Sequence, residues 1–301
     1  MDLGTNTFHL IIVEVSSSGL TEIIHEEEAV KLGEGGINKG FIKEAAFERG
    51  VQCMKRFAGL IAAHHVQGVR AIATSALRNA ANAPDFIDTV KRHTTISIEI
   101  IDGDTEASFI YHGVKTSECL GKKNSLIADI GGGSVEFIIC NQHEIFWQHS
   151  FEIGAARLMD RFHRSDPIPP DSINALNLYL EECLAPLFKA AKQFPVENLI
   201  GSSGVFESYA VIIEKENGRS LDLKETKHYS FDHIEFFALI EKIVLSTHQQ
   251  RLAESDIIPV RVDMIVTASL LARFILQKLN IDEVAMCTYS LKEGVLAEMM
   301  S

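Results

Sequence analysis

A short segment at the start of the chain recurs near its middle, and this repeat constrains the fold more than any other sequence feature. Asp2–Ile12 reads DLGTNTFHLII and Asp129–Ile139 reads DIGGGSVEFII, so the two align without a gap. Each copy has an aspartate at the end of one strand, a turn of glycine and small polar residues, and a second strand rich in β-formers. The repeat therefore predicts two related α/β domains whose turns face each other across a cleft.

Strand and helix patterns alternate along the whole chain, which is typical of an α/β protein. We expect strands at Phe8–Val15, Leu20–Glu28, Val69–Thr74, Ile96–Ile101, Ser125–Ile130, Ser134–Cys140, Glu144–Phe151, Asn198–Gly201 and Val284–Cys287. We expect helices at Glu44–His64, Asp85–Arg92, Asp104–Tyr111 or beyond, Ala155–Phe162, Asp171–Gln193, Val205–Glu216, Asp232–Thr247, Arg261–Leu279 and Lys292–Met300. The first two strands would form a hairpin across Ser16–Gly19.

The segment Lys115–Asn124 is mostly polar and lies between a predicted helix and a predicted strand, so it is the best candidate for a boundary between domains. It divides the chain into a first domain at 1–116 and a second at 117–301, with a hinge near residue 116. We expect the last helix, 292–301, to pack back on the first domain.

The two repeated turns carry the chemical groups that bind phosphate, because backbone N–H groups and short polar side chains can surround its oxygens. The turn residues are Gly4, Thr5, Asn6 and Thr7 in the first copy and Gly131, Gly132, Gly133 and Ser134 in the second. Mg²⁺ prefers one or two carboxylates and keeps several waters, so the preceding Asp2 and Asp129 are candidate ligands. A plain hairpin turn also favours these residue types, but two copies with the aspartate in register favour phosphate binding.

The chain is acidic, with 41 aspartates and glutamates against 28 lysines and arginines and a formal charge of −13. A broad nucleic-acid or anionic-membrane interface needs a positive surface, so the composition argues against both partners. A polyanion can still bind in a cleft, where peptide N–H groups, single basic side chains and a divalent ion act locally. We therefore expect an activity that depends strongly on Mg²⁺.

Neither the cysteines nor the hydropathy pattern indicates an exported or membrane protein. The five cysteines are scattered without a CxxC pair, which argues against a disulfide framework and a zinc site. We expect them to be small buried hydrophobic residues. The longest apolar stretches, Met264–Leu271 and Leu10–Val13, are far shorter than the ~20 residues that cross a bilayer. With no signal-peptide pattern at the start, we expect a cytoplasmic location.

Six short motifs occur in a fixed order from residue 2 to the end of the chain. They are Asp2-x-Gly-Thr-Asn-Thr-Phe-His, Thr74-Ser-Ala-Leu-Arg78, Gly103-Asp-Thr-Glu106-Ala, Asp129-Ile-Gly-Gly-Gly-Ser134-x-Glu136, Gly201-Ser-Ser-Gly204 and Leu291-Lys-Glu-Gly-Val295. Each motif is weak alone, but the ordered series resembles the exopolyphosphatase and guanosine pentaphosphate phosphohydrolase (Ppx/GppA) family. The chain resembles the short form, because it contains no histidine-aspartate pair of the helical domain in long members.

The resemblance implies both a fold and an activity. The fold would be actin-like, of the superfamily that includes ribonuclease H, sugar kinases and heat-shock ATPases, with two α/β domains around five-stranded mixed sheets and a cleft between them. The activity would be hydrolysis of the terminal phosphoanhydride of inorganic polyphosphate, guanosine pentaphosphate or both, with Mg²⁺ as cofactor and Mn²⁺ as a substitute. A homodimer is also implied.

The resemblance assigns roles to individual residues. Glu106 matches the catalytic glutamate and would act as general base toward the attacking water. Asp129 and Glu136 match the metal-side carboxylates, with Asp2 as a third metal candidate. Arg78 would clamp a phosphate and stabilise charge in the transition state. The residues themselves leave other roles open: Glu106 as a helix-capping carboxylate, Glu136 as an exposed strand residue and Arg78 as a surface arginine.

Further phosphate contacts are expected around the two turns. Lys31 matches a basic position beside the family's channel. The remaining candidates are Thr74 and Ser75 before Arg78, together with Gly201, Ser202, Ser203 and Gly204, which also fit an ordinary αβ turn.

Two positions depart from the family pattern. Only Met1 precedes Asp2, so we expect the printed sequence to lack residues ahead of the first turn. Lys292 stands where an arginine is common, which weakens any phosphate contact assigned there.

Two other functions remain open from the sequence. A kinase of the same fold would share the phosphate turns but transfer a phosphoryl group to a bound acceptor. A binding module without catalysis would sense polyphosphate or guanosine polyphosphates. The first predicts a phosphorylated acceptor, and the second predicts binding without phosphate release.

Overall fold

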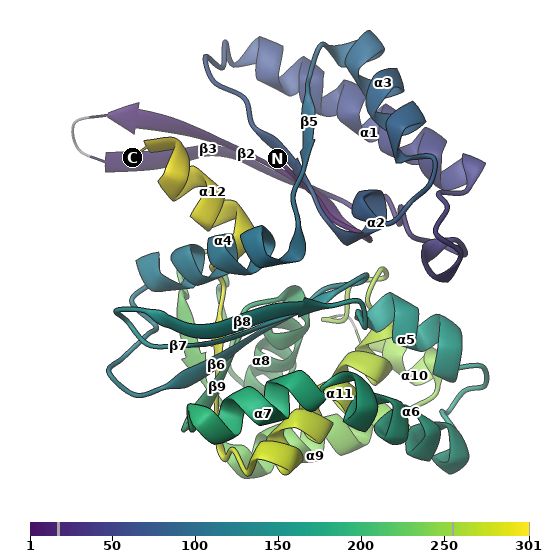
Figure 1. Cartoon of the computed structure of the whole chain (residues 1–301), viewed down its shortest axis with the longest axis vertical. Coiled ribbons are helices and arrows are strands. Elements are labelled where there is room, and N and C mark those ends of the chain that lie inside the picture. The colour runs from purple at the N-terminus through teal and green to yellow at the C-terminus, as the bar shows by residue number, and fades with distance from the viewer. Residues whose placement is uncertain (17–18, 255, 301) are drawn as a thin grey trace. The chain divides into compact units, whose positions relative to one another are not determined.

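The computed structural model describes residues 1–16, 19–254 and 256–300. The chain divides into two compact units, Met1–Asp102 and Gly103–Ser301 (Figure 1). In the described residues, each unit contains one mixed β-sheet with helices, as the duplicated α/β pattern predicts. The boundary expected at residue 116 lies further along the chain, at the end of helix α4 (Gly103–Thr116), and the packing of the last helix on the first domain stays a prediction.

The first unit is built on a five-stranded sheet. Its strands are β1 (Asp2–Leu3), β2 (Phe8–Ser16), β3 (Gly19–Glu28), β4 (Ala71–Ala73) and β5 (Ile98–Ile100), in the order β3-β2-β1-β4-β5. Its helices are α1 (Glu44–Ala63), the short α2 (Ser75–Arg78) and α3 (Ala83–Thr94), with a 3₁₀ turn, η1, at Ile37–Lys39. Ser17 and Ser18, in the predicted hairpin turn between β2 and β3, lie outside the described residues.

Strict alternation in β2 builds the core of this unit. Phe8, Leu10 and Ile12 are buried, while the residues between them are partly exposed. They share a core cluster with Met54 of α1 and Phe86 of α3. Burial of each large side chain stabilises the fold by roughly 1.5–3 kcal/mol, so this face fixes the register of the strands that flank the first turn.

The second unit contains a six-stranded sheet. Its strands are β6 (Ser125–Ile130), β7 (Val135–Cys140), β8 (Ile145–Phe151), β9 (Asn198–Gly201), β10 (His228–Ser230) and β11 (Glu283–Cys287). Its helices besides α4 are α5 (Ala155–Phe162), α6 (Pro170–Cys183), α7 (Ala185–Gln193), α8 (Gly204–Glu216), α9 (His233–Leu245), α10 (His248–Ala253), α11 (Met264–Leu279) and α12 (Leu291–Met300).

Strand β7 is buried along its whole length because helices cover the second sheet on both faces. Helix α4 lies on one face, and α7, α9 and α11 lie on the other (Figure 1). The strand order is β10-β11-β9-β6-β7-β8. The expectation of five strands is wrong for this sheet, because β10 adds an antiparallel edge to β11.

Several predicted helices have different bounds; helix α3, for example, starts and ends two residues outside the expected Asp85–Arg92. Local residue chemistry explains two of the other differences. The helix expected at Asp171–Gln193 is split at Leu184, because Pro186 lacks an N–H and its ring would clash with the preceding turn. The helix expected to reach Thr247 ends at Leu245, since Thr247 caps α10 in a reciprocal pair with Gln250. The helix expected from Arg261 begins at Met264.

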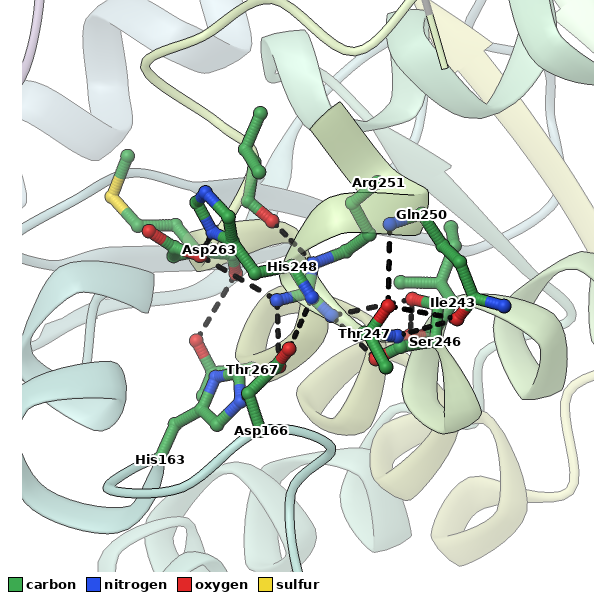
Figure 2. A network of polar contacts seen from close by, with 12 residues as sticks. His163, Asp166, Ile243, Ser246, Thr247, His248, Gln250, Arg251, Asp263 and Thr267 are labelled. Carbon is green, nitrogen blue, oxygen red and sulfur yellow. Dashed lines mark hydrogen bonds and ion pairs between the residues drawn. The ribbon is translucent and has the colours of Figure 1, made fainter. Parts of the chain in front are cut away.

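A buried arginine holds the residues that lead directly into α11. The Arg251 side chain is 2% exposed; its Nε donates to the Val262 carbonyl at 2.6 Å and Nη2 donates to Asp166 Oδ1 at 2.8 Å (Figure 2). Nη1 donates to the Ser246 carbonyl at 2.7 Å. Removing such a charge from a buried pair is costly, so this network holds the segment that leads to Arg261.

None of the described helices is both long and apolar enough to cross a membrane.

Candidate active site

The sequence repeat appears in the structure as two equivalent strand pairs. In the first, Asp2 lies opposite His9 across β1 and β2. In the second, Asp129 lies opposite Glu136 across β6 and β7. The same register closes a four-residue turn in both units, at 4–7 and at 131–134, so the duplicated turn is confirmed.

The first turn is held by a loop that follows β3. The Lys31 N–H donates to the Asn6 carbonyl at 2.7 Å, and the Gly33 N–H donates to the Thr5 carbonyl at 3.0 Å. A peptide N–H points opposite to the carbonyl of its own peptide plane. The N–H groups of Asn6 and Thr7 therefore point away from the loop, in the direction that suits an anion.

Lys31 adopts the left-handed backbone conformation, with φ of 50°. Non-glycine residues take this conformation rarely and usually for a local reason. Here it brings the Lys31 N–H onto Asn6, so the structure places Lys31 directly beside the first turn.

The second turn is held by the N-terminus of α5. The N–H groups of Ala155 and Ala156 donate to the carbonyls of Gly131 and Gly132 at 2.8 and 2.9 Å, and Gly154 donates to Gly133 at 3.1 Å. These bonds satisfy donors that a helix start leaves unpaired. With their carbonyls turned to α5, the peptide planes aim the N–H groups of residues 132–134 the other way.

Gly154 makes this close approach possible. A Cβ at Gly154 would lie 2.4 Å from the Gly132 carbonyl carbon and 2.5 Å from that of Gly133. Arg157 adds a side-chain bond, with Nε donating to the Gly133 carbonyl at 2.7 Å. Thr267 of α11 donates its hydroxyl to the Ala155 carbonyl at 2.9 Å, so α5 is itself fixed to its neighbour.

Asp129 is oriented by two serine hydroxyls. Ser202 donates to its Oδ2 at 3.0 Å and Ser290 donates to the same oxygen at 2.5 Å. Burial raises the pKa of Asp129, while the Ser290 and Ser202 hydrogen bonds and the Lys292 charge oppose the rise. The carboxylate is thus fixed in position, and no ion pair with it occurs among the residues that the structure describes.

Glu136 lies beside Asp129 and is only 2% exposed. Its Oε1 accepts a hydrogen bond from Ser150 at 2.6 Å, and Ser134 of the turn also donates to it. Burial and the negative charges of Glu106 and Asp129 raise its pKa well above the usual range. The alternative of an exposed strand residue is therefore excluded for Glu136.

Glu106 lies in the first turn of α4 and is 6% exposed. Its charge acts on Glu136, so the two carboxylates are close enough to interact. Gly103, at the start of this helix, lies against β8: a Cβ there would be 2.3 Å from the Ser150 Cβ. The second unit thereby brings Glu106, Asp129 and Glu136 into one electrostatically coupled cluster.

The acidic cluster suits Mg²⁺ in its donor chemistry. Among the described residues, no group of three or more His, Cys, Asp or Glu side chains is arranged to hold a metal ion. Mg²⁺ does not require such a group, because it commonly takes one or two carboxylates and keeps its waters. Asp129 and Glu136 provide that pair in cross-strand register. The third metal candidate, Asp2, belongs to the first unit.

The first unit also brings its other predicted phosphate residues together. β1 and β4 are parallel, with Leu3 paired to Ala73, so the first turn and Thr74 follow neighbouring strand ends. Thr74 and Ser75 are buried. Arg78 is half-buried on α2, and its Nη1 donates to the Ile101 carbonyl at 3.1 Å. The surface-arginine alternative does not describe this position.

The Gly201–Gly204 segment lies next to Asp129 but is closely packed. A Cβ at Gly201 would lie 2.1 Å from the Phe206 ring, and one at Gly204 would lie 1.8 Å from Arg261 Nη2. The Arg261 guanidinium therefore covers the start of α8. The Ser203 hydroxyl is buried and has no hydrogen-bond partner within the described part of the chain. A phosphate contact here stays a prediction.

Comparison with known proteins identifies the family. The model of the Ppx/GppA phosphatase family matches residues 11–301. The chain belongs to this family. The fold class is also confirmed, since the solved Ppx/GppA structures share these actin-like α/β domains.

Three relatives illustrate the range of the Ppx/GppA family. An exopolyphosphatase structure from Cytophaga hutchinsonii is 40% identical, with a TM-score of 0.97, over 99% of this chain and 96% of its own. A putative exopolyphosphatase from Haemophilus influenzae is 27% identical over 98% of this chain and 89% of its own. A guanosine-5'-triphosphate,3'-diphosphate pyrophosphatase from Photobacterium profundum is 25% identical over the whole chain, which spans 59% of that relative.

Several residues that support the Ppx/GppA site have no motif of their own. Ser150 lies directly opposite Glu136 in the β7–β8 pair, so a register for that hairpin would have identified it. Gly154 and Ser290 lie outside the aligned repeat, although Ser290 immediately precedes the last motif. Their roles depend on contacts between segments far apart in the sequence, which motif spacing does not encode.

Proposed function

We propose that this chain is a Mg²⁺-dependent phosphohydrolase that releases the terminal orthophosphate of inorganic polyphosphate, guanosine pentaphosphate or both. The observation that carries the proposal is the buried cluster of Glu106, Asp129 and Glu136 beside a turn whose N–H groups are aimed away from α5. Relatives named for both activities support it.

Glu106 is proposed as the general base. It orients a water molecule and accepts its proton as the water oxygen attacks the terminal phosphorus. The bond between that phosphorus and the bridging oxygen breaks, and the shortened chain or nucleotide leaves. Burial of Glu106 supports this role, because a carboxylate shielded from bulk water holds one water more selectively than an exposed cap.

The two turns are proposed to bind the phosphate oxygens. The N–H groups of residues 132–134 stabilise the negative charge that spreads over the transferred group. We assign phosphate contacts in the first unit to Gly4–Thr7, Lys31, Thr74 and Ser75, and a bidentate clamp to Arg78. These assignments rest on donor chemistry and on the family motifs.

Asp129 and Glu136 are proposed to hold Mg²⁺, which when bound supplies positive charge to the phosphate oxygens. Ser202 and Ser290 keep Asp129 in one orientation, and Ser150 does the same for Glu136. Asp2 is the further candidate from the sequence. A mechanism built on fixed carboxylates is sensitive to small displacements, so these serines would contribute to activity through position.

The test is phosphate release from long-chain polyphosphate and from guanosine pentaphosphate, each with Mg²⁺ and with EDTA. Release of orthophosphate only with Mg²⁺, from either substrate, is the expected result. Transfer to an added acceptor without free phosphate would instead show a kinase. Saturable binding without turnover of either substrate would show a binding module, and both results would overturn the proposal.

A further inference from the structure

Two cysteines that are far apart in the sequence meet in the second unit. Cys119 follows α4 in the connection to β6, and Cys287 is the last residue of β11. The Cys287 thiol donates to the Ser117 hydroxyl at 3.1 Å, and the Cys119 N–H donates to the same hydroxyl oxygen at 3.3 Å. The Cys119 sulfur lies 3.6 Å from the Lys227 carbonyl oxygen, and the two thiols are close enough for each to shift the pKa of the other. The pair therefore lies in a defined polar setting, unlike the isolated buried thiols that the sequence suggests.

The two thiols differ in exposure and acidity. Cys119 is partly exposed and Cys287 is buried. The neighbouring Cys287 thiol, together with Ser117 and the Lys227 charge, lowers the pKa of Cys119 to about 7, although burial opposes this. The proximity of Cys119 and burial raise the pKa of Cys287. Because the thiolate is the reactive form, Cys119 is the thiol that meets an oxidant first.

We propose that Cys119 and Cys287 form a dithiol redox pair that a peroxide converts to an intramolecular disulfide. In the first step the Cys119 thiolate attacks one peroxide oxygen and the O–O bond breaks, which leaves a sulfenic acid and water once protons are balanced. In the second step the Cys287 sulfur attacks the Cys119 sulfur and a second water leaves. Two electrons pass from the thiols to the peroxide.

For this bond to form, the two sulfurs must approach to about 2.05 Å. The shared contact with Ser117 already holds the Cys119 backbone and the Cys287 thiol near each other. Cys287 belongs to a strand paired on both sides, with β9 and β10. Cys119 lies in a connection, so it is the residue that moves. The Thr288 N–H and Cys119 both donate to the Lys227 carbonyl, which keeps the two segments together.

The remaining cysteines lack this arrangement. Cys53 and Cys140 are buried, and burial raises the pKa of each to about 12. Cys183 has the same intermediate exposure as Cys119, but it lies on α6 and hydrogen-bonds Tyr179. It therefore provides a matched control for exposure without a neighbouring thiol.

The test maps the bridge by mass spectrometry on the full chain. Reduced protein is treated with hydrogen peroxide near neutral pH, its remaining thiols are blocked, and it is digested without reductant. We expect the free thiols to fall from five to three, with one linked pair of peptides that carries Cys119 and Cys287 and separates with dithiothreitol. Cys183→Ser should give the same linked pair, whereas Cys119→Ser should give none.

A second variant keeps the proposal falsifiable if the bridge is transient. Cys287→Ser should leave Cys119 as a sulfenic acid that dimedone captures in folded protein. Retention of all five thiols in the wild type, a link between other cysteines, or direct conversion of Cys119 to sulfinic acid with Cys287 still free would each overturn it.

Discussion

The two repeated turns have the same backbone plan, but different parts of the fold hold them. A loop at residues 31–33 holds the first turn, whereas the start of helix α5 holds the second. Opposite the aspartate, the first copy has His9 and the second has Glu136. The duplication thus supplies N–H groups twice, but only the second copy adds a paired carboxylate, which makes it the centre of the proposed chemistry.

Glu214, another carboxylate of the second unit, shows how this fold compensates a carboxylate with hydrogen-bond donors and a positive charge. Glu214 accepts two hydrogen bonds from Arg219, at 2.6 and 2.7 Å, and one from Tyr229 at 2.8 Å. The Arg219 hydrogen bond lowers the pKa of Glu214 to about 2. At the second turn the pKa of Glu136 is raised instead. The fold can pair a carboxylate with an arginine, and it does so at Glu214, whereas at Glu136 burial and neighbouring negative charges dominate.

Replacing the carboxylate that distinguishes the second copy should have the largest effect on activity among the variants of this comparison. Glu136→Gln keeps the shape but removes the charge, so we expect phosphate release to fall by about 10²–10³-fold, comparable to loss of one electrostatic group in an active site. His9→Gln, at the equivalent position of the first copy, should stay within a few-fold. Equal losses in the two variants would show that the copies are not specialised.

A methyl group between α5 and the second turn should reduce stability. Gly154→Ala would place a Cβ 2.4 Å from the Gly132 backbone, which cannot rotate away. We expect a loss of about 1–3 kcal/mol in the free energy of unfolding, measured by urea denaturation. Gly59→Ala is the control, since a Cβ at this α1 position meets no atom within 4 Å and should stabilise by about 0.5–1 kcal/mol.

The equivalent substitution at the first turn, Gly33→Ala, should cause a smaller loss of stability, which a second substitution should rescue. Gly33→Ala would place its Cβ 2.6 Å from the Thr5 methyl group, which belongs to a side chain. We expect a loss of about 1 kcal/mol, at the lower end for an overpacked site. Adding Thr5→Ser removes that methyl and should restore most of the stability. If the double variant is no better than Gly33→Ala alone, the loop does not hold the turn through this contact.

Replacing Glu214, the carboxylate paired with Arg219, should have the smallest effect on the free energy of unfolding, and that effect should depend on pH. The folded pKa of Glu214, about 2, lies below the ordinary value of 4.5 for a glutamate, so its pairing stabilises the protein above about pH 4.5. This contribution is lost as the pH falls toward 2. Glu214→Gln should lower the free energy of unfolding at pH 7 by less than about 1 kcal/mol, because the Arg219 side chain of the pair is exposed to solvent. Thermal unfolding of the wild type and Glu214→Gln at pH 7 and pH 3 measures this contribution. The stability difference between the two proteins should be smaller at pH 3 than at pH 7, and an equal difference at both pH values would contradict the prediction.

The sequence predicts the parts of this site that depend on local order. The repeat predicts both turns and the register that places Asp129 opposite Glu136, because a hairpin's pairing follows from its turn. Pro186 and the Thr247-x-x-Gln250 pattern also signal the true helix bounds, although periodicity alone extends both helices too far.

The contacts that hold the site are not encoded locally. The fit of Gly154 against the second turn and the Ser290 hydrogen bond to Asp129 both join segments that meet only after folding. The same is true of Cys119 and Cys287, whose sequence spacing suggests no partnership. Residue spacing therefore predicts the reactive groups, whereas tertiary packing determines which of them are fixed and which are coupled.

The most direct measurement of the central claim is the rate of orthophosphate release by Glu106→Gln, compared with the wild type at saturating Mg²⁺ and substrate. If Glu106 is the general base, the rate falls by about 10²–10⁴-fold, while the Mg²⁺-induced shift in the thermal unfolding midpoint is retained. A rate within a few-fold of the wild type would contradict the assignment, and the proposed mechanism would then lack a general base.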